Sequence, residues 1–261
     1  MNTSLQGKTA LVCGSTKGIG KACAHALASL GANIVLLARD ENALKSAAEE
    51  IKNTFAVDTK YIVADFAQPA KVKEAIQHFV QTNIIHILVN NTGGPPAGLV
   101  SEAKEDEFIS AFNNHLICNH ILATACIPNM KTAQYGRIIN IISTSVKQPL
   151  HNLGVSNTIR AAVGNWAKTL ANEMGQFNIT VNNVLPGATA TERLAAIIQN
   201  KATKTNHAKE DVETEMMNEI PMRRFAPPEE IANAVAFLAS PAASYINGIN
   251  LPVDGGRTGC L

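Results

Sequence analysis

The sequence predicts a doubly wound α/β domain in which helices cover both faces of a parallel sheet, giving three α/β/α layers. Short apolar runs alternate along the chain with longer segments of helical periodicity, which is the pattern of β-α-β units with right-handed crossovers. Several runs are β-branched and apolar at successive positions, as expected for strands buried on both faces. The seven expected strands are 8–13, 33–37, 60–64, 86–90, 137–142, 180–184 and 250–253.

Helix-start signals follow several of these strands. Asp40 is expected to cap the helix that follows the second strand, and Pro69 stands near the start of the next helix. Ser101 is expected to open a helix ahead of Glu102, and Pro227 begins another. The chain shows no internal repeat and no linker-like stretch, so a single domain over 1–261 is predicted.

Composition excludes several function classes. The formal net charge is +1 and no Lys/Arg-rich run occurs, so bulk electrostatics point to neither a nucleic acid nor a membrane partner. The five cysteines form no Cys/His metal spacing, so no metal site is expected, and an odd, scattered set is typical of free thiols in a reducing compartment. Neither a signal peptide nor a membrane-spanning run is recognisable, and a cytoplasmic location is therefore predicted.

One segment interrupts the alternation. From about 188 to 220 the chain is polar, mixed in charge and longer than an ordinary connection. Long connections in compact domains are often functional lids. We expect a lid over a substrate site; the alternative is a surface helical hairpin that takes no part in binding.

A glycine-rich turn follows the first strand and leads directly into a helix. Glycines allow a tight turn and a close approach to a ligand, and the free N–H groups at the helix start attract a pyrophosphate. The position between strand and helix is the context that dinucleotide binding requires. The expected cofactor-binding residues of this turn are Gly14, Ser15, Thr16, Lys17, Gly18, Ile19 and Gly20.

The GxxxGxG spacing of this turn resembles the cofactor loop of the short-chain dehydrogenases/reductases. Four further stretches agree in order and spacing: NNTG at 90–93, NIIS at 140–143, NNVLPG at 182–187 and VDGG at 253–256. The resemblance covers essentially the whole chain, is strongest to the 3-oxoacyl-carrier-protein reductase-like group, and implies a Rossmann fold that assembles as a homotetramer or homodimer. The further cofactor-binding residues that it implies are Asp65, Asn91, Gly93, Arg160, Pro186, Gly187 and Thr191. For Asp65, a helix-entry carboxylate is the alternative.

Charge at the end of the second strand predicts the cofactor. In such folds an acid there binds the ribose 2′-OH of NAD, whereas a nearby Arg accommodates the 2′-phosphate of NADP. The family's acidic position matches Ala38, which is neutral, and Arg39 follows it. Lys17 is expected to supply a second positive charge, and the competing carboxylate, Asp40, is assigned to the helix cap. The sequence therefore predicts NADP(H).

The catalytic pattern is altered. The resemblance implies a Ser, Tyr and Lys, and the chain offers Ser143, then Ser156 in place of the tyrosine and Arg160 in place of the lysine. Ser156 and Arg160 share one helix face. Arginine keeps the positive charge but cannot relay a proton. An aliphatic hydroxyl is a much weaker acid than a phenol, and lost acid–base catalysis typically costs about 10²–10⁴ in rate.

His115 stands where the family commonly has Asn, and an imidazole titrates in the range suited to protonating an alkoxide. It is the candidate replacement donor, with His151 as a second candidate; for each, an ordinary structural residue is the alternative. Three functions remain open: an NADPH-dependent reductase or dehydrogenase of a small carbonyl or acyl thioester substrate such as a 3-oxoacyl thioester, a cofactor-binding sensor or partner subunit without turnover, and a non-redox lyase, dehydratase or epimerase.

Overall fold

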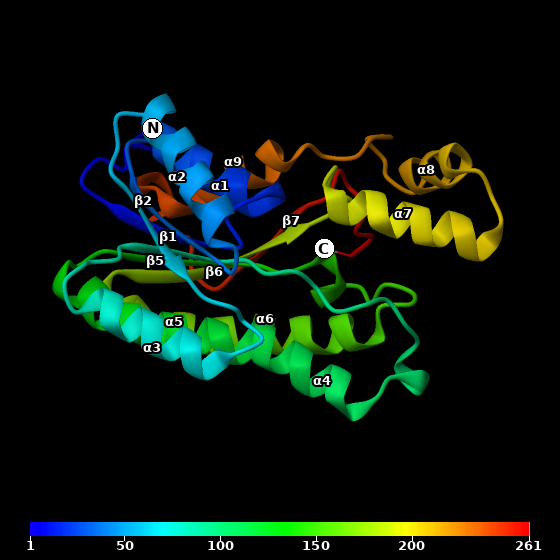
Figure 1. The fold of residues 1–261 in the computed structure, drawn as a ribbon, viewed down its shortest axis with the longest axis horizontal. Coiled ribbons are helices and arrows are strands. Elements are labelled where there is room, and N and C mark those ends of the chain that lie inside the picture. The colour runs from blue at the N-terminus through cyan, green and yellow to red at the C-terminus, as the bar shows by residue number, and fades with distance from the viewer. Residues whose placement is uncertain (261) are drawn as a thin grey trace.

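A computed structural model describes residues 1–260, which form one seven-stranded parallel sheet with helices on both faces (Figure 1). The strand order is β3-β2-β1-β4-β5-β6-β7, and every neighbouring pair is parallel. The strands are β1 (Thr9–Cys13), β2 (Asn33–Ala38), β3 (Thr59–Val63), β4 (Ile87–Asn90), β5 (Gly136–Ile141), β6 (Ile179–Pro186) and β7 (Asn250–Val253). The predicted doubly wound fold is confirmed, and each expected strand is present with its ends shifted by at most two residues.

The helices form two layers. One apolar cluster joins one face of the sheet to α1 (Gly18–Ser29), α2 (Glu41–Thr54) and α9 (Pro228–Ala239). A second cluster joins the other face to α3 (Pro69–Val80), α5 (Cys118–Thr132) and α6 (Gly154–Met174). In Figure 1 the two layers lie on opposite sides of the strands, with α4 (Glu105–Phe112) continuing the second layer.

Three of the predicted helix starts are confirmed, including Pro227 directly before α9, and one is wrong. Asp40 caps α2 by accepting a hydrogen bond of 3.0 Å from the Ala43 N–H, and Pro69 is the first residue of α3. Ser101 opens no α-helix, because Val100–Glu102 is a single 3₁₀ turn and α4 begins at Glu105. The acid that closes the first turn of α4 lies further along: the Glu107 carboxylate accepts a 2.8 Å hydrogen bond from the Lys104 N–H.

Four asparagines lie in register across the carboxyl-terminal half of the sheet, at the positions where β4, β5, β6 and β7 run side by side. Their amides form a continuous chain: Asn90 donates to Asn140 at 2.9 Å, Asn140 to Asn183 at 2.8 Å, and Asn183 to Asn250 at 2.8 Å. Three of the four are buried. Buried polar side chains are stable only when paired, so this ladder fixes the register of the strands that hold the site.

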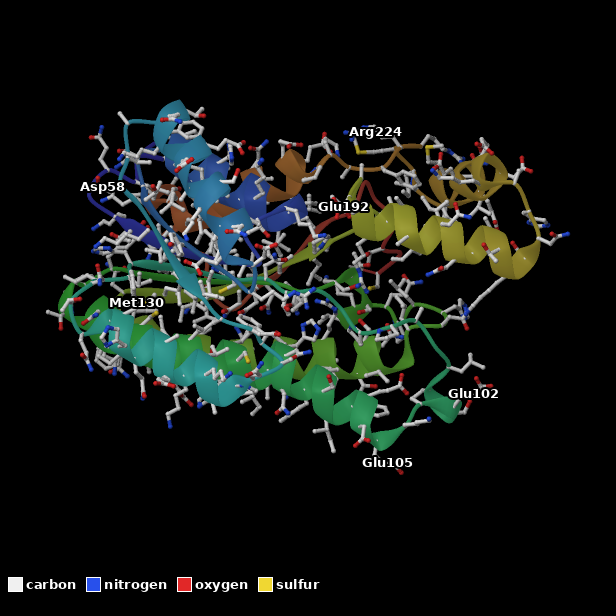
Figure 2. All side chains as sticks on the ribbon, viewed as in Figure 1. Asp58, Glu102, Glu105, Met130, Glu192 and Arg224 are labelled. Atoms are coloured by element: carbon white, nitrogen blue, oxygen red, sulfur yellow. The ribbon has the colours of Figure 1, made fainter. Side chains whose placement is uncertain are left out.

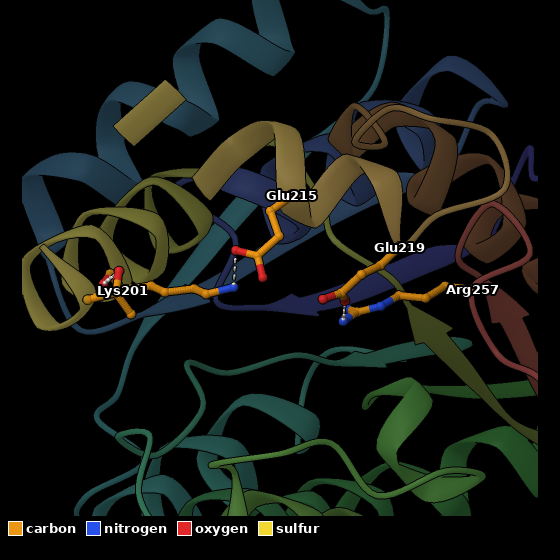
Figure 3. Close-up of polar contacts among 5 residues, drawn as sticks. Lys201, Glu215, Glu219 and Arg257 are labelled. Atoms are coloured by element: carbon orange, nitrogen blue, oxygen red, sulfur yellow. Dashed lines mark hydrogen bonds and ion pairs between the residues drawn. The ribbon is translucent and has the colours of Figure 1, made fainter. Parts of the chain in front are cut away.

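The polar segment after β6 folds into α7 (Glu192–Thr205) and α8 (Lys209–Asn218), which project beyond one end of the sheet (Figure 1). The pair has a small apolar core of its own around Leu194, Ile198 and Val212. Figure 3 shows two ion pairs at its base, Lys201 with Glu215 at 2.9 Å and Glu219 with Arg257 of the C-terminal segment. No helix within residues 1–260 is long and apolar enough to cross a membrane.

Candidate active site

The site lies at the carboxyl ends of β1 and β4, which are neighbours in the sheet although their connections lead to opposite faces. Ligands of doubly wound sheets bind at this switch point. The glycine turn leaves β1 here, and the segment 91–98 leaves β4 beside it. The expected cofactor and catalytic residues therefore gather at one edge of the sheet.

The glycine turn has no room for side chains. Gly14 and Gly18 have φ of +57° and +55°, a region that favours glycine. A Cβ on Gly20 would lie 2.1 Å from the Gly14 carbonyl oxygen. No side chain caps the start of α1 at Lys17, so the first-turn N–H groups remain available to an anion. This backbone cradle fits the diphosphate of a dinucleotide.

Two predicted cofactor residues direct their side chains into the protein. The Asn91 amide donates to the carbonyls of Cys13 and Gly14, at 3.2 and 3.4 Å, and so holds the turn against β4. The buried Ser15 hydroxyl donates to the Leu37 carbonyl at 3.4 Å. Both residues shape the turn, and only their backbone groups are left to face a ligand. Thr16 is half-buried, and Ile19 packs on the core beneath α1.

Arg39 is an exposed cation at the end of β2 with no ion-pair partner in the chain as described to residue 260. Asp40, its only acidic neighbour in sequence, is engaged as the cap of α2. Lys17, the second expected phosphate ligand, pairs with Glu192 at 2.5 Å, and both side chains are largely exposed. Asp65 accepts a 3.0 Å hydrogen bond from the Ala67 N–H in the turn ahead of α3, whose N-cap residue is Gln68.

The end of β6 brings the helical pair of α7 and α8 to the glycine turn. Gly187 has Asp254 against it, since a Cβ there would lie 2.7 Å from the Asp254 Cα. The Thr191 hydroxyl caps α7 by accepting from the Leu194 N–H at 3.4 Å, and the Thr191 methyl lies 3.4 Å from where a Gly18 Cβ would stand. The same edge as the glycine turn is thus lined by Pro186, Gly187 and Thr191. Figure 2 shows Glu192 at the start of α7, close to α1.

The three expected polar groups of the catalytic centre come together at the end of β5. Ser143 begins a 3₁₀ turn, and its hydroxyl accepts from the Ser145 N–H at 3.1 Å. Ser156 and Arg160, one turn apart on α6, are both buried, and the Arg160 Nε donates to the Ser156 Oγ at 3.2 Å. Because Ser156 accepts this bond, its own hydroxyl proton is free for another acceptor.

Arg160 is also fixed by the backbone of the strand beneath it. Its Nη1 donates to the carbonyls of Ile142 and Ile141, at 2.8 and 3.4 Å. Burial, and secondarily the charge of Arg193, lower the Arg160 pKa to about 10. The guanidinium is still protonated at neutral pH, so a full positive charge is held at the end of β5.

His115 lies in a π-helical turn, Asn113–Ile117, between α4 and α5. Such turns are frequent at functional sites. Burial, followed by the charges of Arg160 and Arg193, lowers the His115 pKa to about 3. The imidazole is therefore neutral at physiological pH, which removes the reason for expecting it to supply the proton as an imidazolium. His151 is exposed in the loop before α6.

Arg193 and Gly94 belong to the site although the sequence did not single them out. Arg193, near the start of α7, donates from Nη1 to the Gly94 carbonyl at 2.9 Å and from Nη2 to the Pro95 carbonyl at 3.2 Å. By contrast, the predicted Gly93 has open space around it. Arg193 stands two positions after the expected Thr191, but its partner is 99 residues away in the chain, and no local pattern encodes such a contact.

Fold and site together define a doubly wound protein of the dinucleotide-binding class. The family model described as enoyl-(acyl carrier protein) reductase matches residues 14–258. The chain belongs to the short-chain dehydrogenase/reductase family.

Similar proteins agree with this placement. The chain is 35% identical, over 97% of its length and 98% of the relative's, to the 3-oxoacyl-[acyl-carrier-protein] reductase FabG of Pseudomonas aeruginosa. It is similar to L-sorbose reductase of Gluconobacter frateurii, solved with NADPH and L-sorbose, with 32% identity, a TM-score of 0.94 and full coverage of both chains. A putative NAD(P)-dependent gluconate 5-dehydrogenase of Beutenbergia cavernae, with bound NADP, matches at 29% identity and a TM-score of 0.91, again over both full chains.

Proposed function

We propose that the protein is an NADP(H)-dependent oxidoreductase that transfers a hydride between the nicotinamide and a carbonyl/alcohol substrate. The observation that carries the proposal is the position of the Arg160 guanidinium, at the end of β5 and next to the segment that follows β4. Its guanidinium bonds the carbonyls at the end of β5 and neighbours Gly94 after β4, so the family's catalytic positions stand beside the dinucleotide edge. A 3-oxoacyl thioester is one candidate substrate, by likeness to the FabG relatives.

NADP(H) is favoured over NAD(H) by the end of β2. Ala38 offers no carboxylate to a ribose 2′-OH, Asp40 is engaged in capping α2, and Arg39 is exposed and unpaired in the described chain. The guanidinium group of an arginine can donate two hydrogen bonds at once to the oxygens of a phosphate. Similar structures solved with NADPH or NADP support the same choice.

The chain's own part in catalysis is to hold the substrate carbonyl and to stabilise the charge that develops on it. When bound, the reduced nicotinamide supplies the hydride. Ser143 and Ser156 donate hydrogen bonds to the carbonyl oxygen, and the fixed charge of Arg160 lies behind Ser156 at 3.2 Å. Preorganised charge and donors of this kind stabilise an alkoxide in a site that excludes water. The proton comes from solvent: the Ser156 hydroxyl passes its proton to the alkoxide as it takes one from water, because neither neutral His115 nor the Arg160 guanidinium releases a proton readily at neutral pH.

Cofactor choice is tested by calorimetry with NADPH and NADH. The Arg39→Ala variant should bind NADPH about 10- to 100-fold more weakly, the value of one charge-assisted contact, and NADH almost unchanged. Lys52→Ala, which removes an exposed cation of α2, is the matched control and should alter neither affinity. Equal affinity of the unmodified protein for the two cofactors would contradict the assignment, and absence of NADPH consumption across ketones and acyl thioesters would contradict the redox function.

A second candidate, an NADP(H)-binding protein without turnover, is favoured by one observation: no tyrosine replaces the family's phenol. The Tyr135 hydroxyl donates to the Ala239 carbonyl at 2.6 Å, Tyr61 bonds Glu41, and Tyr245 is fully exposed. Turnover by the double variant Ser156→Tyr with Arg160→Lys, and none by the unmodified protein at equal NADPH affinity, would decide for this candidate.

The remaining features are proposed on the same basis. The chain forms one domain in which residues 188–220 act as a substrate lid, supported by the contacts of Thr191 and Arg193 with the segments after β1 and β4.

Self-association as a homotetramer or homodimer is supported by the exposed apolar side chains of Ile109 and Phe112 on α4, which in water favour a partner. A cytoplasmic location is supported by the free thiols of the chain, which are typical of a reducing compartment.

A further inference from the structure

Two arginines converge on Gly94 from different elements. Arg160 reaches it from α6 and Arg193 from α7: a Cβ built on Gly94 would lie 3.0 Å from the Arg160 Nη2 and 2.7 Å from the Arg193 Nη2. Both nitrogens are therefore close to one point, and to each other. Both charges also help to lower the pKa of the buried His115, after the larger effect of its burial.

No carboxylate balances these charges. Neither arginine forms an ion pair or hydrogen bond with an acid anywhere in residues 1–260, where every partner of the two guanidinium groups is a carbonyl or the Ser156 hydroxyl. Like charges this close repel, and burial of Arg160 strengthens the repulsion. Elsewhere the chain does pair its arginines with acids, as in Arg224 with Glu230 and Arg257 with Glu219. Arg39, Arg137 and Arg223 also lack an acidic partner within residues 1–260, and the site differs from them in holding two such cations close together.

Each arginine also keeps an uncommitted N–H donor. The Arg160 Nη2 takes part in none of the hydrogen bonds of the described chain, and the Arg193 Nη2 uses one of its two N–H groups on the Pro95 carbonyl and keeps the other. Two guanidinium donors near one point match the two oxygens of a carboxylate, for which arginine is the preferred partner. The site of the proposed hydride transfer is adjacent, because Arg160 is bonded to Ser156.

We infer that the substrate carries a free carboxylate beside its reacting carbonyl, and that Arg193 from the lid binds this carboxylate together with Arg160. The inference rests on the proposed function and names its substrate class, the short oxo acids and the matching hydroxy acids. In the reducing direction the carbonyl carbon gains a hydride from NADPH, the carbonyl oxygen gains a proton, and the products are a hydroxy acid and NADP⁺. The carboxylate is unchanged.

The test compares 2-, 3- and 4-oxo acids of four to six carbons with their methyl esters, which lack the charge. With NADPH, the unmodified protein should show kcat/KM higher for one of the acids than for its ester by roughly 10- to 100-fold, the value of a charge-assisted pair. Arg193→Gln keeps a donor of similar shape but no charge, and should bring this ratio close to one, mainly through KM. Arg223→Gln is the control, since Arg223 is an exposed arginine bonded to Asn218, and should leave the ratio unchanged.

A binding measurement separates this inference from the proposed function. The oxo acid is titrated into the protein saturated with NADP⁺, where no reduction is possible. Binding of the acid but not the ester, weakened about tenfold or more by Arg193→Gln, supports the inference even if no turnover is found. Turnover of esters and acids at equal kcat/KM would retain the oxidoreductase and overturn the carboxylate site.

Two further outcomes also overturn it. If Arg193→Gln weakens NADPH binding while the acid-to-ester ratio stays the same, the arginine serves the cofactor diphosphate. If inorganic phosphate or a keto phosphate binds more tightly than every oxo acid, the two arginines hold a phosphate group. Thermal melting of each variant, with NADPH affinity as a second check, confirms that the folded state is intact.

Discussion

The two halves of the site differ in how they depart from the family they belong to. By the resemblance drawn from the sequence, the cofactor half keeps the glycine turn of the family and differs from it at Ala38, which is neutral where the family has an acid. By the same resemblance, the catalytic half matches the family at Ser143 and differs from it at His115, Ser156 and Arg160. In the cofactor half the diphosphate would rest on backbone groups that only glycine can leave accessible, since Gly20 has the Gly14 carbonyl against it, and the 2′-phosphate would meet the side chain of Arg39. The proposed catalytic half consists of side chains from the turn after β5, the π-helical turn Asn113–Ile117, α6 and α7.

This difference shows where the fold constrains the sequence. A turn with positive φ and no room for a Cβ allows one residue type, so its pattern survives. A side-chain cluster needs charge and donors at given points, and different residues can provide them. Arg160 keeps the positive charge of the family's lysine while it also fixes Ser156 and bonds two carbonyls of β5.

The largest expected effect is in the cofactor half. Gly20→Ala places a Cβ 2.1 Å from the Gly14 oxygen and 2.8 Å from the Asn91 amide, so the turn must open. Opening it removes several N–H contacts to the diphosphate, and NADPH affinity should fall at least about 100-fold in calorimetry. Gly98→Ala, which meets nothing within 4 Å, is the control and should retain affinity. Unchanged binding by Gly20→Ala would mean that the dinucleotide does not rest on this turn.

The sequence predicted most of the cofactor half because its signals are local. The seven strands follow from apolar runs, the Asp40 cap from its position before a helical pattern, and the glycine turn from its spacing. The start of α4 was missed because a 3₁₀ turn, a tertiary detail, separates Ser101 from Glu105.

In the catalytic half the sequence predicted candidate residues but could not predict their surroundings. The low His115 pKa depends on burial and on two arginines distant in sequence. The contact of Arg193 with Gly94 likewise depends on how α7 returns across the sheet edge. Lys17 was expected to be free for a phosphate and is paired with Glu192.

The second prediction concerns stability in the catalytic half. The folded protein keeps His115 neutral down to about pH 3, whereas the unfolded chain takes up a proton near pH 6.5. Unfolding is therefore coupled to proton uptake between these two pH values. The contribution of neutral His115 to the free energy of unfolding is complete above pH 6.5 and is lost as the pH falls below it. From pH 7 to pH 5 the unmodified protein should lose about 2 kcal/mol of unfolding free energy beyond the loss in His115→Asn.

Urea unfolding at the two pH values measures this difference. The other six histidines are common to both proteins, so their titration cancels. Equal losses would show that His115 titrates normally, which would restore it as a candidate proton donor and weaken the contrast between the two halves. A larger loss in His115→Asn would contradict the prediction outright.

The smallest effect is expected where the two halves meet, at the ion pair between Lys17 of the glycine turn and Glu192 of α7. Both side chains are more than 70% exposed, at 72% and 76%, so Glu192→Gln should change the free energy of unfolding by less than about 1 kcal/mol. The same change removes a carboxylate beside the expected 2′-phosphate and frees Lys17. NADPH affinity should therefore rise about two- to fivefold at low salt, NADH affinity should not, and the gain should shrink as salt screens the charges.

The control is Glu213→Gln, which removes another carboxylate from an ion pair on α8 and should change neither the NADPH affinity nor the NADH affinity. A fall in NADPH affinity in Glu192→Gln would instead assign the pair to holding the lid against the glycine turn, and Lys17 would then belong to the lid contact instead of the phosphate site.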